Sequence, residues 1–361
     1  MTLFPKVQAM TTEPWEKLRH LPLTIESYEV DRLNATFAQG FQRVTSLVRL
    51  IGGGHEGHSE DVSPFEGEDD TLHVLGPFLP LAGEWTLESF CDHLASLDQW
   101  PVPARWDMAK RWRNWAFEAA ALDLALNQAG KPFHEAVGRD PRGVRFVNSL
   151  GLGEPPTFDP LAARLEHHPD LHFKLDVKPE WSDALMRQVA DTGAVEVIDF
   201  KGRYGMEMGE KADLLGMYER VIATFPDALL EDAHELPEVE ALLASQAGRI
   251  SYDAPIARVA DCDAQPLAPR AVNIKPCRVG DLRSLFALYA ECDARGLVMY
   301  GGGMGEIGIG RHQIQLLASL FHPDGPNDTA PSGYNAEIPA PDLPASPLPP
   351  DPAPTGFRRA G

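Results

Sequence analysis

The strongest constraint on the fold is a rhythm that begins near Arg142 and continues to residue 335. Short apolar segments alternate there with longer helical ones such as SDALMRQVADTG and ADLLGMYERVIATF. The apolar segments are VRFVN, LHFKLDV, AVEVIDF, DALLED, GRISYD, AVNIK and GLVMY. Repeated strand and helix units predict parallel β/α units, and the length suits a modified (β/α)8-type TIM barrel, an α/β fold. An open doubly wound sheet is the structural alternative.

The chain before the barrel has another pattern, with strands first and helices after them. TIESYEV and VTSLVRLI are typical of strands, and WTLESFCDHLASL and AKRWRNWAFEAAALDLALNQAGKPF of helices. This order predicts an α+β capping domain over residues 23–141 and a barrel domain over residues 142–335. We expect residues 1–22 to form an irregular lead-in. Residues 336–361 contain eight prolines and few apolar side chains, which predicts a disordered tail.

Charge and cysteine content limit the partners and the compartment. The chain has 32 Lys and Arg against 53 Asp and Glu, a net charge of −21, so we expect neither nucleic acid nor a membrane surface as a partner. No apolar run approaches the roughly 20 residues that span a bilayer, and the first residues do not resemble a secretory signal. The four cysteines form no C-x-x-C pair, which favours a reduced, cytoplasmic compartment.

Charged residues stand at the ends of five consecutive apolar segments. They are Lys174 and Asp176, Asp199 and Lys201, Glu231 and Asp232, Asp253, and Lys275. In a parallel barrel these ends share the face that carries the chemistry. Three carboxylates from adjacent strands, those of Asp199, Glu231 and Asp253, predict a site for one hard divalent cation, Mg²⁺ or alternatively Mn²⁺. The plainer explanation, which suffices for any one of these residues alone, is that charge is common where strands meet loops.

Several of these segments resemble the enolase superfamily. Within it they are similar to the o-succinylbenzoate synthases and N-succinylamino acid racemases of the muconate lactonizing enzyme-like subgroup. The most specific match contains NIKPCRVGDL and GLVMYGGGMGEIGIGRHQIQLLASL. Further similar segments are FKLDVKPEW, VIDFKGRY, LLEDAHE, ISYDAPI, NDTAPSGY and the cap helix EAAALDLALNQAGKPFHEAVG. The resemblance runs from about residue 24 to residue 335 and implies a modified barrel with an α+β capping domain.

The resemblance implies a Mg²⁺-dependent enzyme that removes the proton α to a carboxylate and holds the enediolate against the cation. The implied metal ligands are Asp199, Glu231 and Asp253. Lys275 and Lys174 stand at the positions of family lysines. The expected partners are a small carboxylate substrate and, as the alternative to a monomer, a second copy of the chain.

The glycine-rich segment after the seventh strand predicts a loop whose backbone N–H groups meet a substrate oxygen. Its predicted substrate-binding residues are Gly303, Met304 and Glu306, the last at the rim of the site. The spacing Gly303-x-Gly305-x-x-Gly308 also spells a dinucleotide fingerprint, but the further strand and acidic residue that this motif needs are missing. Residues 55–58, H-E-G-H, are too short for a zinc protease motif and predict a hairpin turn.

Departures from the family pattern affect the predicted base. Asp176 replaces the second-strand catalytic lysine, Lys201 stands where asparagine is expected, and Ala254 follows the third ligand where glutamate is usual. Either the charges have been exchanged and Lys201 is a displaced base, or Asp176 and Lys201 form an ion pair and Lys275 is the only base.

One base suffices for an elimination, whereas a racemase needs a proton acceptor on each face of the α-carbon. The sequence therefore favours an o-succinylbenzoate synthase-like lyase that works by dehydration or elimination. The alternatives are an N-acylamino acid racemase or epimerase, and a metal-binding homologue that has lost the ancestral catalysis.

Overall fold

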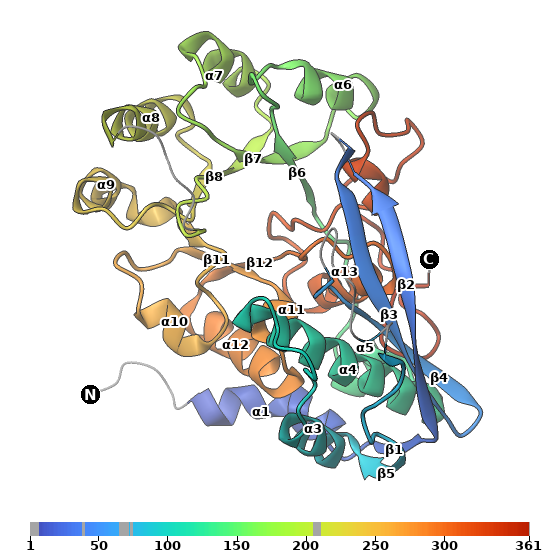
Figure 1. Ribbon diagram of the computed structural model, residues 1–361. Helices are drawn as coiled ribbons and strands as arrows, with labels where there is room; N and C mark the ends of the chain where they lie inside the picture. Colours follow the sequence, from blue (N-terminus) through green and yellow to red (C-terminus); the bar gives the residue numbers. More distant parts are fainter. Residues whose placement is uncertain (1–6, 38–39, 65–71, 73–74, 205–210, 361) are drawn as a thin grey trace, which may run out of the picture.

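A parallel seven-stranded sheet forms the centre of the molecule (Figure 1), and its strands lie side by side in the order in which they follow along the chain. The computed structural model describes residues 7–37, 40–64, 72, 75–204 and 211–360. The strands are β6 (Val147–Gly151), β7 (His172–Asp176), β8 (Val195–Asp199), β9 (Leu229–Glu231), β10 (Ile250–Tyr252), β11 (Ala271–Ile274) and β12 (Val298–Gly301). Two single bridges join the edges, because Asn327 pairs with Phe146 and Asp328 pairs with Gly302. Residues 327–328 thus take the eighth position, and the predicted barrel-type α/β fold is confirmed.

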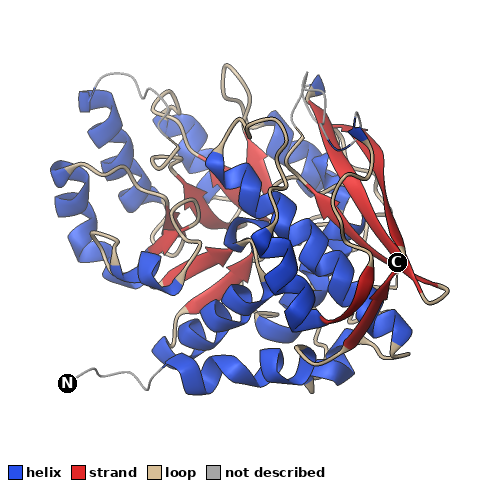
Figure 2. Ribbon diagram, turned by 60° about the horizontal axis from the view of Figure 1, so that its bottom comes forward, coloured by secondary structure: helices blue, strands red, loops and turns tan. Residues whose placement is uncertain are grey.

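Helices follow the strands and cover the outside of the sheet (Figure 2). They are α6 (Asp159–His167), α7 (Asp183–Ala190), α8 (Lys211–Thr224), α9 (Pro237–Leu243), α10 (Val259–Asp263), α11 (Pro276–Val279), α12 (Leu282–Arg295) and α13 (Ile309–Phe321). A 3-10 helix, η2 (Ala244–Arg249), follows α9, and another, η3 (Ser332–Asn335), follows the barrel. Side chains alternate along each strand, so Phe173 and Leu175 pack outward on the helices. Lys174 and Asp176 point to the barrel interior.

The capping domain combines two antiparallel sheets with helices. Its strands are β1 (Pro22–Ile25), β2 (Ser27–Thr36), β3 (Gln42–Gly52), β4 (His55–Asp61) and β5 (Gly83–Thr86), and its helices are α3 (Leu87–Ser96), α4 (Asp107–Gln128) and α5 (Phe133–Val137). The hairpin turn between β3 and β4 lies at Gly53 and Gly54, so the prediction of a turn at residues 55–58 is wrong, because these residues pair with β3 as the start of β4. Gly57 lets β4 lie directly on α4, because a Cβ there would be 2.3 Å from the carbonyl oxygen of Ala120.

The prediction of an irregular lead-in over residues 1–22 is wrong for Val7–Leu18, which form the helix α1. Helix α1 packs against α12 of the barrel. Trp15 is 5% exposed and Leu18 is fully buried. Burial of these two apolar side chains stabilises a segment whose sequence carries Pro14 and little periodicity. Residues 1–6 lie outside the described part of the chain.

The prediction of a disordered tail over residues 336–361 is also wrong for the residues that the structure describes. Leu348 and Val144 exchange two backbone hydrogen bonds of 2.8 Å. The fully buried ring of Phe357 lies 4.6 Å from that of Phe133, and the Phe357 N–H donates to Asp123 of α4. A few apolar anchors therefore fix the tail across both domains, and prolines reduce the entropy lost on ordering it.

All four cysteines are buried and free. Among the described helices, none is long and apolar enough to cross a membrane.

Candidate active site

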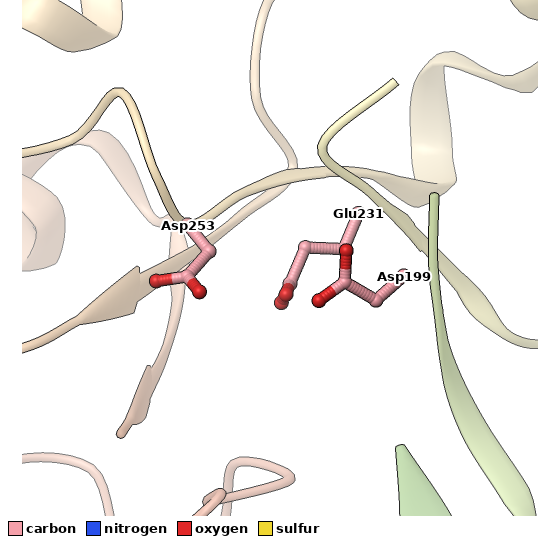
Figure 3. Close-up of side chains that lie close together, drawn as sticks. All are labelled: Asp199, Glu231 and Asp253. Atoms are coloured by element: carbon pink, nitrogen blue, oxygen red, sulfur yellow. The ribbon is translucent and has the colours of Figure 1, made fainter. Parts of the chain in front are cut away.

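Three carboxylates converge at the carboxyl ends of adjacent strands (Figure 3). Asp199 and Glu231 are the last residues of β8 and β9 and lie opposite each other in the register. Asp253 directly follows β10. All three residues are fully buried, and one oxygen from each lies within 4.8 Å of the others. The three predicted metal ligands are thus brought together by the strand register.

The ammonium group of Lys174 lies among these carboxylates. Its Nζ is 3.2 Å from Asp199 Oδ2 and 3.8 Å from Asp253 Oδ2, and it donates a hydrogen bond to Glu231. Burial raises the pKa of Glu231 well above its usual value, and the other two carboxylates add to this although Lys174 opposes it. A positive charge is therefore stabilised at the centre of the cluster. An all-oxygen donor set in this environment fits a hard divalent cation.

Neighbouring side chains hold the carboxylates in place. Arg278 Nη1 donates to Asp253 Oδ1 at 2.5 Å, and Lys275 Nζ donates to Asp253 Oδ2 at 2.8 Å. Burial alone raises the pKa of Asp253, but Arg278 and Lys275 outweigh it and hold this pKa well below its usual value. Tyr300 donates to Glu231, and its hydroxyl lies 2.6 Å from Ser251 Oγ.

Three of these residues, Arg278, Tyr300 and Ser251, are not among the predicted site residues. Arg278 follows Lys275 by one helical turn in NIKPCRVGD, which is a signal that was available. Tyr300 and Ser251 lie at interior positions of short apolar strands and carry no such signal.

Asp232 supports the cluster through the backbone rather than by facing it. Its carboxylate accepts the N–H groups of Asp253 and Ala254, both at 2.8 Å. Its own backbone has φ +51, an uncommon conformation for a residue other than glycine. This arrangement fixes the end of β10 from which Asp253 projects.

Asp176 and Lys201 lie side by side next to the triad. Lys201 Nζ is 3.2 Å from Asp176 Oδ1 and 2.5 Å from Asp199 Oδ2. Burial lowers the pKa of Lys201, but Asp176 and Asp199 outweigh it and keep this pKa well above its usual value. The two residues that depart from the family pattern therefore form an ion pair, as one of the two interpretations requires. The role of Lys201 as a displaced base remains a prediction.

The glycine-rich loop after β12 is held by the capping domain. Arg43 of β3 donates to the carbonyl oxygens of Met304 and Gly305 at 2.9 and 3.0 Å. Glu306 is 3% exposed and accepts the N–H of Met304, so it lies inside the loop and not at the rim as predicted. Met304 Sδ lies 3.8 Å from Arg278 Nη2, which places Met304 beside the triad.

Gly303 lies in the same loop, where a Cβ would be 2.1 Å from Glu306 Oε2. The N–H groups of Ile307, Gly308 and Gly310, at the start of α13, donate to the carboxylate of Glu60. An internal carboxylate thus takes the place at which a dinucleotide motif would bind phosphate.

The chain matches two family models over nearly all of its two domains. The models are described as "Domain of unknown function (DUF8230)", the N-terminal domain over residues 16–136 and the C-terminal domain over residues 140–336.

The chain is also similar, at 25–26% identity, to two enzymes of established name. The o-succinylbenzoate synthase of Geobacillus kaustophilus is 26% identical over 231 residues, or 61% of this chain and 59% of that protein. The N-succinylamino acid racemase of Thermus thermophilus is 25% identical over 311 residues, or 80% of this chain and 79% of that protein. The chain thus spans 59% of the length of the Geobacillus relative.

Solved structures share the fold. A member of the enolase superfamily from Enterococcus faecalis matches with a TM-score of 0.60 and 21% identity, covering 84% of this chain and 86% of that one. A dipeptide epimerase from Methylococcus capsulatus, solved with a Mg ion, matches with a TM-score of 0.65 and 19% identity, covering 84% and 89%. The resemblance that the sequence motifs indicate is confirmed.

Proposed function

The chain belongs to the DUF8230 family and has the enolase-superfamily fold, and from this premise we propose that it is a divalent-metal-dependent enzyme that removes the proton α to a substrate carboxylate. The observation that carries the proposal is the buried triad of Asp199, Glu231 and Asp253, whose oxygens lie within 4.8 Å of one another. The superfamily relatives named above are enzymes, a synthase, a racemase and an epimerase.

The three carboxylates would hold Mg²⁺, or Mn²⁺ in its place, and the ion would supply positive charge to the carboxylate oxygens of a small substrate. Arg278 and Tyr300 fix the orientation of Asp253 and Glu231 through direct hydrogen bonds. Lys174 neutralises the cluster from the β7 side. These residues would thus hold the carboxylates in a fixed orientation next to the bound substrate.

Lys275 is the proposed base. It follows β11 on the same barrel face as the triad, is 6% exposed, and among the described residues has one carboxylate partner, Asp253. Lys201 is held by two carboxylates, so its Nζ is less available to take a proton from carbon. A single available base supports an elimination such as the dehydration catalysed by an o-succinylbenzoate synthase.

Racemisation or epimerisation of an N-acylamino acid is the second candidate. It is favoured by the position of Lys201 after β8, three strands away from β11 in the sheet order. Two ammonium groups on separated strands are the arrangement that a two-base reaction needs.

Proton exchange in D₂O tests the proposal and separates the candidates. The full chain with Mg²⁺ is incubated with N-succinylamino acids and with the substrate of o-succinylbenzoate synthase, and the α-proton is followed by NMR. We expect metal-dependent loss of the α-proton signal, abolished in Lys275→Met and retained in Lys178→Met, a matched change at an exposed lysine.

Dehydration, or deuterium in one enantiomer only, supports one base. Deuterium in both enantiomers supports the racemase. Metal binding without exchange of the α-proton of any substrate would overturn the proposed activity and would support a metal-binding homologue without catalysis.

A further inference from the structure

The side chain of Lys174 contacts all three carboxylates of the candidate metal centre. Its Nζ donates a hydrogen bond to Glu231 and lies 3.2 Å from Asp199 Oδ2 and 3.8 Å from Asp253 Oδ2. The side chain is 1% exposed, so the ammonium group is enclosed with these oxygens and is not shared with solvent. Burial lowers the pKa of Lys174, but the nearby carboxylates outweigh it and hold this pKa well above its usual value. A full positive charge therefore lies inside the cluster.

The strand register explains how this ammonium group reaches the cluster. Asp176 lies opposite Asp199 in the pairing of β7 with β8, whereas Lys174 lies opposite Val197. Lys174 is thus rooted two residues deeper in the barrel than the ends of these strands. Its side chain extends from there toward the three carboxyl groups, which face one another in Figure 3.

A divalent ion bound by one oxygen from each carboxylate would need the same enclosed space. Mg²⁺ lies about 2.0–2.1 Å from its oxygen ligands, and the three oxygens are within 4.8 Å of one another. The Lys174 nitrogen is already in contact with all three carboxylates, and two positive charges a few ångströms apart repel each other strongly in a buried site. The cluster can therefore hold either the ammonium group or the ion in full contact, but not both.

We propose that Lys174 is an internal cation that holds the place of the divalent ion and leaves it when the ion binds. Its side chain then sets the ion affinity of the triad, a role that rests on the proposed function because the triad must be a metal centre. Without a bound ion, the ammonium group keeps three buried carboxylates from repelling one another. An entering ion must displace this group, so its apparent affinity equals the intrinsic affinity multiplied by the fraction of molecules whose triad is free of Lys174.

The carboxylates stay in place when Lys174 leaves them, because each has another partner. These partners are Lys201 for Asp199, Tyr300 for Glu231, and Lys275 with Arg278 for Asp253. The exchange of the ammonium group for an ion therefore does not require the site to rearrange.

Asp328 is the acceptor that we expect for the displaced ammonium group. It pairs with Gly302 at the eighth position of the barrel, is half-buried, and forms no ion pair with another described residue. Its charge already contributes to the raised pKa of Lys174. The ammonium group can therefore leave the triad without losing every carboxylate near it.

Mn²⁺ affinity and thermal unfolding of the full chain test this role. The wild type is compared with Lys174→Met and with Lys178→Met, a matched change at an exposed lysine. Lys174→Met should bind Mn²⁺ at least about tenfold more tightly, as expected if fewer than about a tenth of wild-type molecules have a triad free of Lys174. In EDTA its Tm should be at least about 5 °C lower, because three buried carboxylates lose a shared counter-charge. Saturating Mn²⁺ should raise its Tm by more than it raises that of the wild type, and Lys178→Met should behave like the wild type throughout.

A crystal structure of the wild-type chain with Mg²⁺ tests the exchange without any substitution. With the ion bound, Lys174 Nζ should lie more than about 4 Å from at least two of the three carboxylates, and closer to Asp328. If Nζ still contacts all three carboxylates beside the ion, the exchange is overturned, even where Lys174→Met binds Mn²⁺ more tightly, because charge repulsion alone would explain that gain. If Nζ leaves the triad but does not approach Asp328, only the role of Asp328 is overturned.

These measurements separate this role from the proposed function. A wild-type chain that binds no Mn²⁺ would refute the metal centre, and the role of Lys174 with it. A wild-type chain that binds Mn²⁺, together with a Lys174→Met variant that binds it no more tightly, would overturn the role of Lys174 alone. Tighter binding by Lys174→Met, with Lys174 displaced in the Mg²⁺ structure, supports this role even if no substrate is turned over.

Discussion

Lys201 Nζ lies 3.2 Å from Asp176 Oδ1 and 2.5 Å from Asp199 Oδ2, so one ammonium group joins the candidate metal ligand Asp199 to the neighbouring carboxylate of Asp176. The Lys201 N–H also donates to Asp199 Oδ1 at 2.9 Å. Asp176 and Lys201 are each about one third exposed at the side chain. The pair therefore acts as a bridge between the ends of β7 and β8.

A double-mutant cycle tests this bridge. Asp176→Asn, Lys201→Met and the double variant are compared by urea unfolding. We expect an interaction free energy of about 1 kcal/mol, because the two groups are in contact but partly solvated. Lys201→Met should cost more than Asp176→Asn, since it also removes the contact with Asp199. Strictly additive effects would show that the two side chains do not interact.

Arg43 is expected to hold the glycine-rich loop to the cap. It is 4% exposed and donates to the carbonyl oxygens of Val62, Pro64, Met304 and Gly305. Arg43→Met should lower the free energy of unfolding by about 3 kcal/mol, because it leaves buried carbonyls unpaired. Hydrogen exchange in residues 302–308 should become faster.

Arg49→Met is the matched control on the same strand. Arg49 forms partly exposed ion pairs with Glu29 and Asp31, so its loss should cost less than about 1 kcal/mol. Equal effects of the two substitutions would contradict the role given to Arg43.

Phe357 is expected to anchor the C-terminal segment. Phe357→Ala should destabilise the protein by about 3–5 kcal/mol, the usual cost of removing a buried aromatic ring. Ile338→Ala, at a position 67% exposed in the same segment, should change stability by less than about 0.5 kcal/mol. Guanidinium unfolding of both variants measures the difference. A Phe357→Ala variant as stable as the wild type would show that the tail is not fixed in solution.

Glu118 predicts a pH dependence of stability. Burial, together with Asp281, raises its pKa to about 7 from a usual value of 4.5. A raised folded-state pKa stabilises the protein at low pH, and this contribution is lost as pH rises through about 7. Relative to Glu118→Gln, the wild type should lose up to about 3 kcal/mol between pH 4 and pH 9. Parallel pH profiles of the two proteins would contradict the raised pKa.

The barrel fold and the convergence of the three carboxylates could be predicted because each depends on short, local sequence patterns. Apolar strands of regular spacing end in charged residues, and in a parallel sheet those ends meet at one face. The pairing of β8 with β9 then places Asp199 opposite Glu231, and no contact between distant segments is needed for this.

The remaining features depend on contacts between segments far apart in the chain. Proline-rich composition indicated disorder for the tail, but Phe357 finds a pocket formed by α4 and α5 that the tail's own sequence does not encode. The predicted position of Glu306 at the rim of the site is wrong, because its carboxylate turns back to the N–H of Met304. The ion pair of Asp176 with Lys201 depends on β7 and β8 lying side by side, which the separate sequence segments do not specify.

A titration with Mn²⁺, followed by electron paramagnetic resonance, tests the central claim most directly. The wild-type chain should bind one Mn²⁺ that Mg²⁺ displaces, and Glu231→Gln should weaken binding at least about 100-fold. Glu235→Gln, the same change at an exposed glutamate nearby, should bind like the wild type. A wild-type chain that binds no Mn²⁺, or a Glu231→Gln variant that binds it as tightly, would contradict the assignment of Asp199, Glu231 and Asp253 as the metal centre.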